Sequence, residues 1–327
     1  MNEKLLIFIS LLLIPLSGLG IDLYSPSLPA IAAYFQVPSY YAKLTISVYL
    51  LGFGFGQLIF GTASHSFGRK KSLLVGLALF FIGSILATTT HNIYVLYTMR
   101  VLQGLGAASA SAISKALITD MFTGKKLYIT MNYLVTAWAT GPIIAPFIGG
   151  YMQFYFGWQA NFYLYAAYAA LLLLMTGLRL NETIKERTTL RPAMIARNFR
   201  IILSNPQFFS GVICLGLGYS TIVIFNVAGA FLIQKTLGYN AIFFGKIALL
   251  VGVAYFSATF LNRFLVQIIS PATLMSVGLC LMLVFSGLYL VFAYSFLLSI
   301  YTVVTPVFLI IFSTGFIFSN IMSKCLS

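Results

Sequence analysis

The chain has 327 residues, of which 60% are hydrophobic and only 7% are charged, and its net charge is +14. The apolar residues form blocks long enough to cross a hydrocarbon core of roughly 30 Å as helices, and too long for barrel strands. This composition excludes a water-soluble globular protein and predicts an all-α, polytopic membrane protein.

Ten apolar blocks are expected to form transmembrane helices, separated by short, turn-rich connections. In chain order the blocks cover Leu5–Tyr34, Thr45–Ala63, Leu73–Thr89, Ile93–Ile118, Leu127–Tyr151, Phe162–Leu178, Phe208–Ile233, Phe244–Leu261, Thr273–Ala293 and Leu297–Asn320. The first block follows Lys4 as a signal peptide would, but it is longer than a signal-peptide core and further blocks follow. We therefore interpret it as the first transmembrane helix.

The basic residues fall predominantly on one side of these helices. If the N-terminus is cytoplasmic, Lys43, Lys235 and Lys246 face outward. The residues expected inside are Lys4, Arg69, Lys70, Lys71, Lys125, Lys126, Arg179, Lys185, Arg187, Arg191, Arg197, Arg200, Arg263 and Lys324. The positive-inside rule therefore places both termini in the cytoplasm. The net charge is a topology signal, and no nucleic-acid site is expected.

The order of the blocks suggests two pseudo-repeated halves. We expect a six-helix bundle over residues 1–178, a basic cytoplasmic linker over 179–206 and about four helices over 207–327. By its own internal symmetry the second half therefore lacks two helices.

Asp22 is the one acidic residue in an apolar block of the first half that does not lie at a helix end by every interpretation, and it lies about 26 Å from the inner end of its block at 1.5 Å per residue. Pro15, Gly18, Pro26 and Pro29 recur with it every three or four residues and share its helical face. A carboxylate on such a small, polar face predicts a helix that lines a cavity. The alternative is that the helix ends near Ile21 and Asp22 lies at the outer interface.

The connection after the second block contains two glycines seven residues apart and a basic triplet. Its notable residues are Gly61, His65, Gly68, Arg69 and Lys70. The glycines permit close packing and a tight turn. Taken alone, the basic residues indicate only a cytoplasmic loop.

Arg100 lies in the fourth block, about 10 Å below its outer end. Gln103 continues the same face one turn later. An arginine at that depth needs a partner or water, and Asp22 at a similar depth is the obvious candidate. The alternative is that Arg100 reaches outward to the headgroups.

The fifth block carries two adjacent stripes of small residues and prolines. Its notable residues are Gly141, Pro142, Pro146, Gly149 and Gly150. Small stripes let helix backbones approach closely, and prolines bend a helix. We expect a specific bend here, with ordinary helix packing as the alternative.

Four of these stretches together resemble the major facilitator superfamily, and specifically its drug:proton antiporters of the Bcr/CflA type. Asp22–Pro29, Gly61–Lys71, Arg100–Gly106 and Gly141–Gly150 are similar to the signatures of the first helix, loop 2–3, the fourth helix and the fifth helix, in order. Asn262–Phe264 sits where a degenerate copy of the loop signature is expected. The resemblance covers essentially the whole chain.

There are two departures from the pattern. The loop signature has an acidic residue where this chain has His65, and the eleventh and twelfth helices of the family are absent from the sequence. In the family that acid interacts with the neighbouring arginine and with the eleventh helix. Both departures affect the same interface, which fits a truncated or decaying gene as well as a fragment.

The resemblance implies proton-driven export of small amphipathic or cationic compounds by alternating access, from a bacterial cytoplasmic membrane. It implies that Asp22 exchanges the proton and that Arg100 favours its ionised form. Tyr24 and Gln103, with Asn226 and Asn320 in the second half, are candidate substrate-cavity residues. The expected partners are a small-molecule substrate, protons and the lipid bilayer, and the protein is expected to be a monomer.

Three alternatives remain open at this point. The alternatives to proton-driven export are a non-transporting remnant, a binding or regulatory membrane protein of the same fold, and a uniporter or symporter. An enzyme is not expected, because no nucleophile–base pair, phosphate loop or metal-ligand cluster stands at usable spacing. No cofactor and no metal are expected either.

Overall fold

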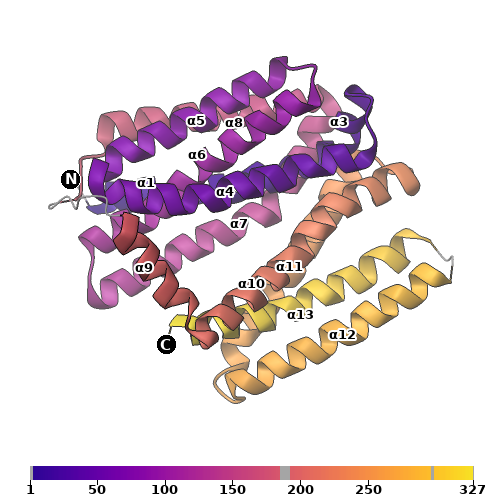
Figure 1. Ribbon diagram of the computed structural model, residues 1–327. Helices are drawn as coiled ribbons and strands as arrows, with labels where there is room; N and C mark the ends of the chain where they lie inside the picture. Colours follow the sequence, from indigo (N-terminus) through magenta and orange to yellow (C-terminus); the bar gives the residue numbers. More distant parts are fainter. Residues whose placement is uncertain (1–2, 185–191, 296–297, 327) are drawn as a thin grey trace. The chain divides into compact units, whose positions relative to one another are not determined.

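The computed structural model describes residues 3–184, 192–295 and 298–326, and every regular element among them is a helix (Figure 1). Ten helical segments of this described part are long and apolar enough to cross a membrane, as the sequence predicts. Two compact units make up the chain, Met1–Arg191 and Pro192–Ser327. Residues 185–191 of the expected linker lie outside the described residues.

The first span of unit 1 is a broken helix. It consists of α1 (Glu3–Leu13), α2 (Leu16–Asp22), a 3₁₀ turn η1 (Ser25–Ser27) and α3 (Leu28–Tyr34). Each break lies at a proline, since proline supplies no backbone N–H and crowds the preceding turn. The residues from Pro15 to Pro29 are therefore not one face of a continuous helix, which corrects that part of the sequence interpretation.

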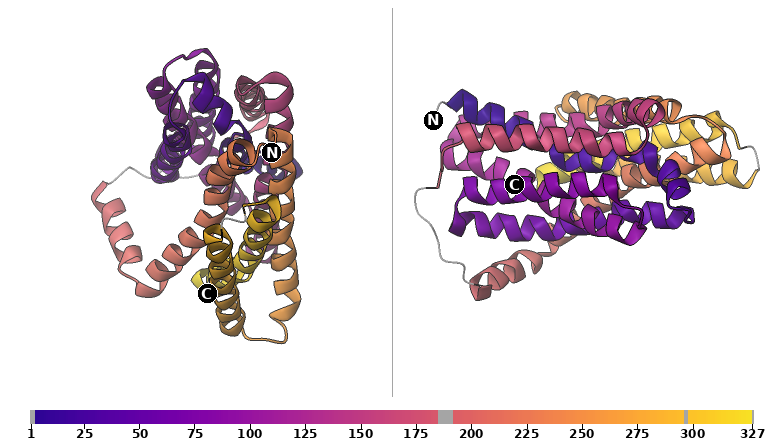
Figure 2. Two further views of the ribbon diagram at one scale, coloured as in Figure 1. Left: turned by 90° about the vertical axis from the view of Figure 1, so that its right-hand side faces the viewer. Right: turned by 90° about the horizontal axis from the view of Figure 1, so that it is seen from above.

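Five continuous helices complete unit 1. They are α4 (Ser39–Phe67), α5 (Arg69–Thr89), α6 (Ile93–Met121), α7 (Gly124–Phe156) and α8 (Gln159–Arg179). The helices run side by side, with α4, α5 and α6 adjacent (Figures 1 and 2). At the crossing of α4 and α6 a Cβ on Gly104 would overlap the carbonyl oxygen of Tyr49, so this approach requires glycine.

Unit 2 begins with α9 (Pro192–Leu203), a short amphipathic helix within the expected linker. It meets α10 (Pro206–Ile224) at an angle (Figures 1 and 2). The chain continues from α10 through two π-helical segments, η2 (Phe225–Gly229) and η3 (Leu232–Thr236), which belong to the same span. The π-helical geometry is rare and often marks functional positions.

Three further helices follow in unit 2: α11 (Ala241–Leu265), α12 (Pro271–Tyr294) and α13 (Ile300–Leu326). The helices α12 and α13 pack along each other (Figure 1). An apolar core joins η2, η3, α11 and α13. Its buried members are Phe225, Ala230, Ile233, Phe244, Ala248, Val251 and Ile311.

Candidate functional site

Arg100 is a completely buried cation in the middle of unit 1. Its side chain is 0% exposed, although α6 crosses the apolar region. The guanidinium donates from Nη2 to the carbonyl oxygen of Gly20 at 2.5 Å and from Nη1 to Oε1 of Gln103 at 2.8 Å. A longer contact, 3.4 Å, joins Nε to the carbonyl oxygen of Thr45. These contacts satisfy a charge that would be costly in lipid, so Arg100 does not extend outward to the headgroups.

Two tyrosine rings enclose the Arg100 guanidinium. Its carbon lies 4.5 Å from the ring centre of Tyr24 and 4.4 Å from that of Tyr49. Both distances are within the range of a cation–π contact, which strengthens when water is excluded. The Tyr49 hydroxyl in turn donates to the carbonyl oxygen of Ser17. The guanidinium therefore connects α6 to α4 and to the broken first span.

Gln103 orients Arg100 and is itself held in place. Its Oε1 accepts from Arg100, and its Nε2 donates to the Ser84 hydroxyl of α5 at 2.8 Å. Both Gln103 and Tyr24, expected from the sequence to line the substrate cavity, are 0% exposed and contact Arg100. In this structure they position the guanidinium, and neither presents an open surface.

Asp22 ends α2 and is 2% exposed. The backbone carbonyl that Arg100 binds belongs to Gly20, two residues before Asp22. A Cβ on Gly18 would lie 3.5 Å from Asp22 Oδ2 and 3.6 Å from Pro142 Cδ of α7. The Asp22 carboxylate therefore lies inside the bundle, between the first span and α7, and α2 ends at this residue.

The small-residue motif of α7 packs against this same segment. A Cβ on Gly149 would overlap the carbonyl oxygen of Leu23, so glycine is required where α7 approaches the residue after Asp22. Gly141, Pro146 and Gly150 are also buried, and α7 is one helix that contains both Pro142 and Pro146. The first-helix and fifth-helix motifs are thus parts of one packing arrangement.

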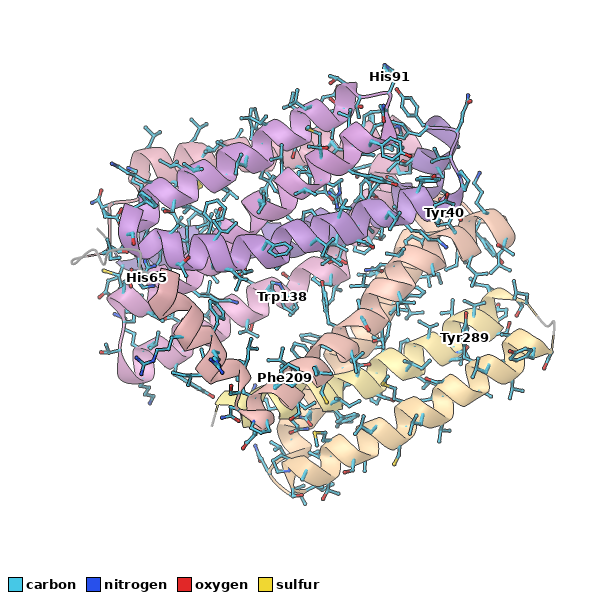
Figure 3. The ribbon with its side chains drawn as sticks, viewed as in Figure 1. Tyr40, His65, His91, Trp138, Phe209 and Tyr289 are labelled. Atoms are coloured by element: carbon cyan, nitrogen blue, oxygen red, sulfur yellow. The ribbon has the colours of Figure 1, made fainter. Side chains whose placement is uncertain are left out.

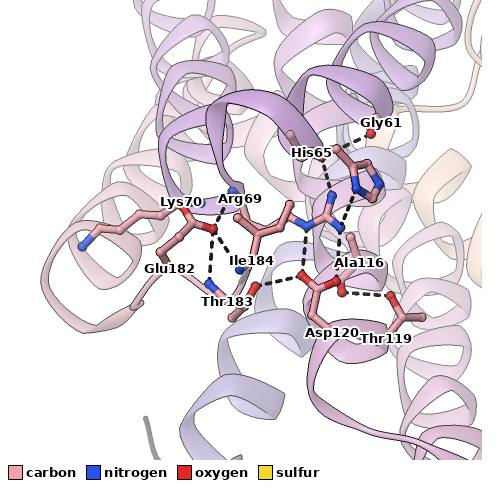
Figure 4. Close-up of polar contacts among 11 residues, drawn as sticks. Gly61, His65, Arg69, Lys70, Ala116, Thr119, Asp120, Glu182, Thr183 and Ile184 are labelled. Carbon is pink, nitrogen blue, oxygen red and sulfur yellow. Dashed lines mark hydrogen bonds and ion pairs between the residues drawn. The ribbon is translucent and has the colours of Figure 1, made fainter. Parts of the chain in front are cut away.

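A second polar cluster lies at the other end of α4 and contains Arg69 (Figure 4). The Arg69 guanidinium binds the Asp120 carboxylate through Nε at 3.0 Å and Nη2 at 3.2 Å. It also donates from Nη1 to the Ser64 hydroxyl at 2.7 Å and lies 3.4 Å from Nδ1 of His65. Asp120, which ends α6, therefore supplies an acid to Arg69, although the loop itself has His65 in place of one.

Residues after α8 complete this Arg69 cluster. The Glu182 carboxylate accepts the backbone N–H groups of Arg69 at 2.8 Å and Lys70 at 3.3 Å, at the start of α5 (Figure 4). A carboxylate stabilises a helix N-terminus at this position. The Thr183 hydroxyl donates to Asp120 Oδ2 at 2.9 Å. Gly68, with φ of 100°, makes the turn between α4 and α5 beside Glu182.

Asp120, Glu182 and Thr183 were not among the candidate residues from sequence. Asp120 and Glu182 are two of only five acidic residues in the chain, and that rarity was the available signal. Gly61, His65, Gly68, Arg69 and Lys70 were expected to act together. The structure places His65, Gly68, Arg69 and Lys70 around Asp120 and Glu182, and the Gly61 carbonyl oxygen accepts from Ser64.

The two candidate asparagines of unit 2 occupy different surroundings. Asn320 is 5% exposed, and its Nδ2 donates to Asn262 Oδ1 at 2.8 Å and to the Phe316 carbonyl oxygen. This contact joins α13 to the C-terminal end of α11, where the degenerate loop signature lies. Asn226 is buried within the π-helical segment η2. That unusual backbone makes Asn226 the stronger candidate for a functional role.

The two histidines lie at opposite ends of unit 1, with His65 in the last turn of α4 and His91 in hydrogen-bond contact with the Tyr34 hydroxyl (Figure 3). They cannot share a metal ion. Among the residues that the structure describes, no group of three or more histidine, cysteine or acidic side chains is placed to hold a metal.

The family model of the Major Facilitator Superfamily matches residues 11–327. The chain belongs to this superfamily. Its members are membrane transporters, and the ten apolar helices accordingly belong to a multi-pass membrane transporter and not to an enzyme.

Curated relatives within the superfamily include proteins named for drug resistance. The chain is 27% identical over 287 residues to the bicyclomycin resistance protein homolog of Haemophilus influenzae, covering 86% of this chain and 72% of that protein. It is 28% identical over 271 residues to the multidrug resistance protein MdtL of Escherichia fergusonii, covering 81% and 68%. These relatives confirm the resemblance to the Bcr/CflA type.

Solved structures confirm the fold. The chain superposes on a D-xylose–proton symporter with a TM-score of 0.74 over 98% of this chain and 81% of that one, at 18% identity. It also superposes on the human organic anion transporter MFSD10 with a TM-score of 0.61 at 16% identity. At these identities the likeness concerns architecture alone.

Proposed function

We propose that this transporter exports small amphipathic compounds from the bacterial cytoplasm in exchange for protons. The drug-resistance names of its relatives support drug export. The observation that carries proton exchange is Asp22, a carboxylate that is 2% exposed inside an apolar span. Intramembrane carboxylates of this kind are costly, and proton relays commonly use them.

Asp22 is the proposed proton carrier. The outward-facing protein takes up a proton on the carboxylate, and the neutral acid is stable in an apolar site. In the inward-facing protein the proton leaves to the cytoplasm and substrate binds, and the loaded site then returns outward. The net exchange is one substrate out for the protons carried in. The two pseudo-repeated halves rock about the site, so that it faces one side at a time.

Arg100 has a positioning role in this scheme. It binds the backbone at Gly20 and packs between Tyr24 and Tyr49, so it fixes the segment that ends at Asp22. A guanidinium near a carboxylate also favours its ionised form. Protonation of Asp22 changes the local charge balance around this fixed cation, and such a change can alter the packing of the broken first span.

The Arg69 cluster is proposed to stabilise one conformation of unit 1 at its cytoplasmic end. It joins α4, α5, α6 and the segment after α8 through one guanidinium and two carboxylates. The proposed orientation has both termini in the cytoplasm, as the basic residues indicate. The proposed functional unit is a monomer, with each site contributed by a single chain.

The test is the substitution Asp22→Asn, which keeps the side-chain size and removes the titrating proton. We expect the variant to lose proton-driven accumulation of substrate in everted vesicles energised by respiration, by at least tenfold. Glu3→Gln is the matched control, because Glu3 is an exposed carboxylate paired with Lys126 outside the proposed pathway. Unchanged uptake by the Asp22→Asn variant, collapsing with a protonophore as in the parent, would exclude Asp22 as the carrier.

A further inference from the structure

The acidic residues of this chain are confined to its first unit. The five are Glu3, Asp22, Asp120, Glu182 and Glu186, and no acidic residue follows in the remaining sequence to Ser327. Unit 2, from Pro192 onward, therefore contains no carboxylate side chain. Residues 192–327 therefore offer a cationic substrate no acidic side chain.

Most carboxylates of unit 1 are already engaged away from the membrane interior. Glu3 pairs with Lys126. Asp120 is bound by Arg69 and Thr183, and Glu182 accepts two backbone N–H groups of α5. Glu186 lies outside the described residues, in the polar segment after α8. Among the acidic residues that the structure describes, Asp22 is thus the one in the interior of an apolar span.

The surroundings of Asp22 are already positive. Arg100, fully buried, binds the carbonyl oxygen of Gly20 on the same short segment. Aromatic faces could attract a cationic substrate in place of a carboxylate. Here the rings of Tyr24 and Tyr49 both face the Arg100 guanidinium, at 4.5 and 4.4 Å.

We infer that the transported compounds carry no net positive charge and are neutral or anionic amphipathic molecules. This inference rests on the proposed function, in which the Asp22–Arg100 region is the transport site. A cation entering that region meets a fixed guanidinium and one carboxylate that must also carry the proton. At an effective dielectric constant of about 20, a unit charge about 10 Å away changes affinity by roughly tenfold.

The test uses three xanthene dyes that share a scaffold and differ in charge: rhodamine 123, a cation; rhodamine 110, a net-neutral zwitterion; and fluorescein, an anion. Binding to the full chain in nanodiscs is measured by fluorescence anisotropy, and transport is measured in proteoliposomes with an imposed pH gradient. We expect rhodamine 110 and fluorescein to bind at least about tenfold more tightly than rhodamine 123. Equal or tighter binding of rhodamine 123 would overturn the inference.

The paired measurements separate this inference from the proposed function. If the dyes bind in the expected order but none accumulates, the charge preference stands and proton-driven export fails. If all three accumulate equally with the pH gradient, export stands and the charge preference fails. Absence of binding by all three dyes would count against both.

The substitution Gln103→Glu tests the cause of the preference. It places a carboxylate of nearly the same shape against the Arg100 guanidinium, which Gln103 Oε1 now contacts at 2.8 Å. We expect the discrimination against rhodamine 123 to fall by about tenfold. Gln159→Glu makes the same chemical change at the first residue of α8, outside the buried cluster, and serves as the control. Unchanged discrimination in a folded Gln103→Glu variant would remove Arg100 as its source.

Discussion

Buried charges in this transporter are satisfied in two different ways. Arg69 has a carboxylate, Asp120, in bidentate contact. Arg100 is held by carbonyl oxygens, an amide oxygen and two aromatic rings. Neutral groups contact the Arg100 guanidinium, and the Asp22 carboxylate lies on the same short segment as Gly20, whereas the Arg69 guanidinium binds a carboxylate directly. The arrangement around Arg100 suits a site whose charge changes during transport. The arrangement around Arg69 suits a fixed contact between helices.

The Arg69–Asp120 pair is expected to contribute to stability. The side chains are 3% and 17% exposed, so removing one partner leaves an uncompensated charge that is mostly buried. We expect Arg69→Ala to reduce the free energy of unfolding by about 3 kcal/mol. The double variant with Asp120→Ala should cost less than the sum of the two single changes. Denaturant unfolding of the purified protein measures both effects.

The exposed Lys126–Glu3 ion pair provides the comparison for the single and double substitutions of Arg69 and Asp120. Its side chains are 56% and 53% exposed, and such pairs contribute about 0–1 kcal/mol. We expect Lys126→Ala to leave the unfolding midpoint nearly unchanged. Additive effects of the Arg69 and Asp120 substitutions would show that the contact does not stabilise the protein.

At the scale of helices, the broken first span depends on its neighbour α7. The span changes from α-helix to 3₁₀ geometry just after Asp22, and α7 approaches the backbone there at Gly149. Both sides of this contact contain residues that are uncommon inside helices. The first span contributes prolines, and α7 contributes glycines. Close backbone packing keeps the carboxylate at one depth while the helix around it is interrupted.

Gly149→Ala tests this contact. The added methyl group would overlap the carbonyl oxygen of Leu23, so we expect a loss of about 1–3 kcal/mol in unfolding free energy and reduced transport. Gly177→Ala in α8 is the matched control, because open space surrounds its Cβ position. That change should be neutral or stabilising, since alanine favours helix. Similar stability of the two variants would contradict the close approach described here.

Sequence patterns predicted the helices of the whole molecule better than the contacts between them. Ten apolar blocks were enough to locate ten spans, because lipid permits few alternatives to a helix. The partners of Arg69 could not be foreseen in the same way. Asp120 and Glu182 are 51 and 113 residues away from it, and only the folded bundle brings them together.

The candidate transport site was predicted in part. Asp22 and Arg100 were selected for their depth, and the structure places Arg100 against the backbone two residues before Asp22. The binding of Arg100 by Gly20, Tyr24 and Tyr49 could not be predicted, because it depends on how the first span breaks and how tightly α4 meets α6. The rotation of each helix about its axis is a tertiary property that apolar block length does not encode.

The distribution of titrating groups over the two units predicts which substitutions shift the pH midpoint of transport. Asn226→Ala, in unit 2, is expected to change dye affinity while the pH midpoint of transport stays where it is in the parent. Asp22→Glu, in unit 1, is expected to move that midpoint, because it repositions the proposed proton carrier. Initial transport rates between pH 5 and 8 measure both. A shifted midpoint in the Asn226→Ala variant would place part of the proton chemistry in unit 2.

The confinement of acidic residues to the first unit has an evolutionary consequence. Both histidines are also in unit 1, so unit 2 has no side chain of a type that ordinarily gains or loses a proton between pH 4 and 8. Under the proposed function, its surface can therefore diversify toward new compounds without disturbing the proton carrier in unit 1. Resistance to a new compound would then arise through changes in unit 2, while the proposed carrier Asp22 stays the same.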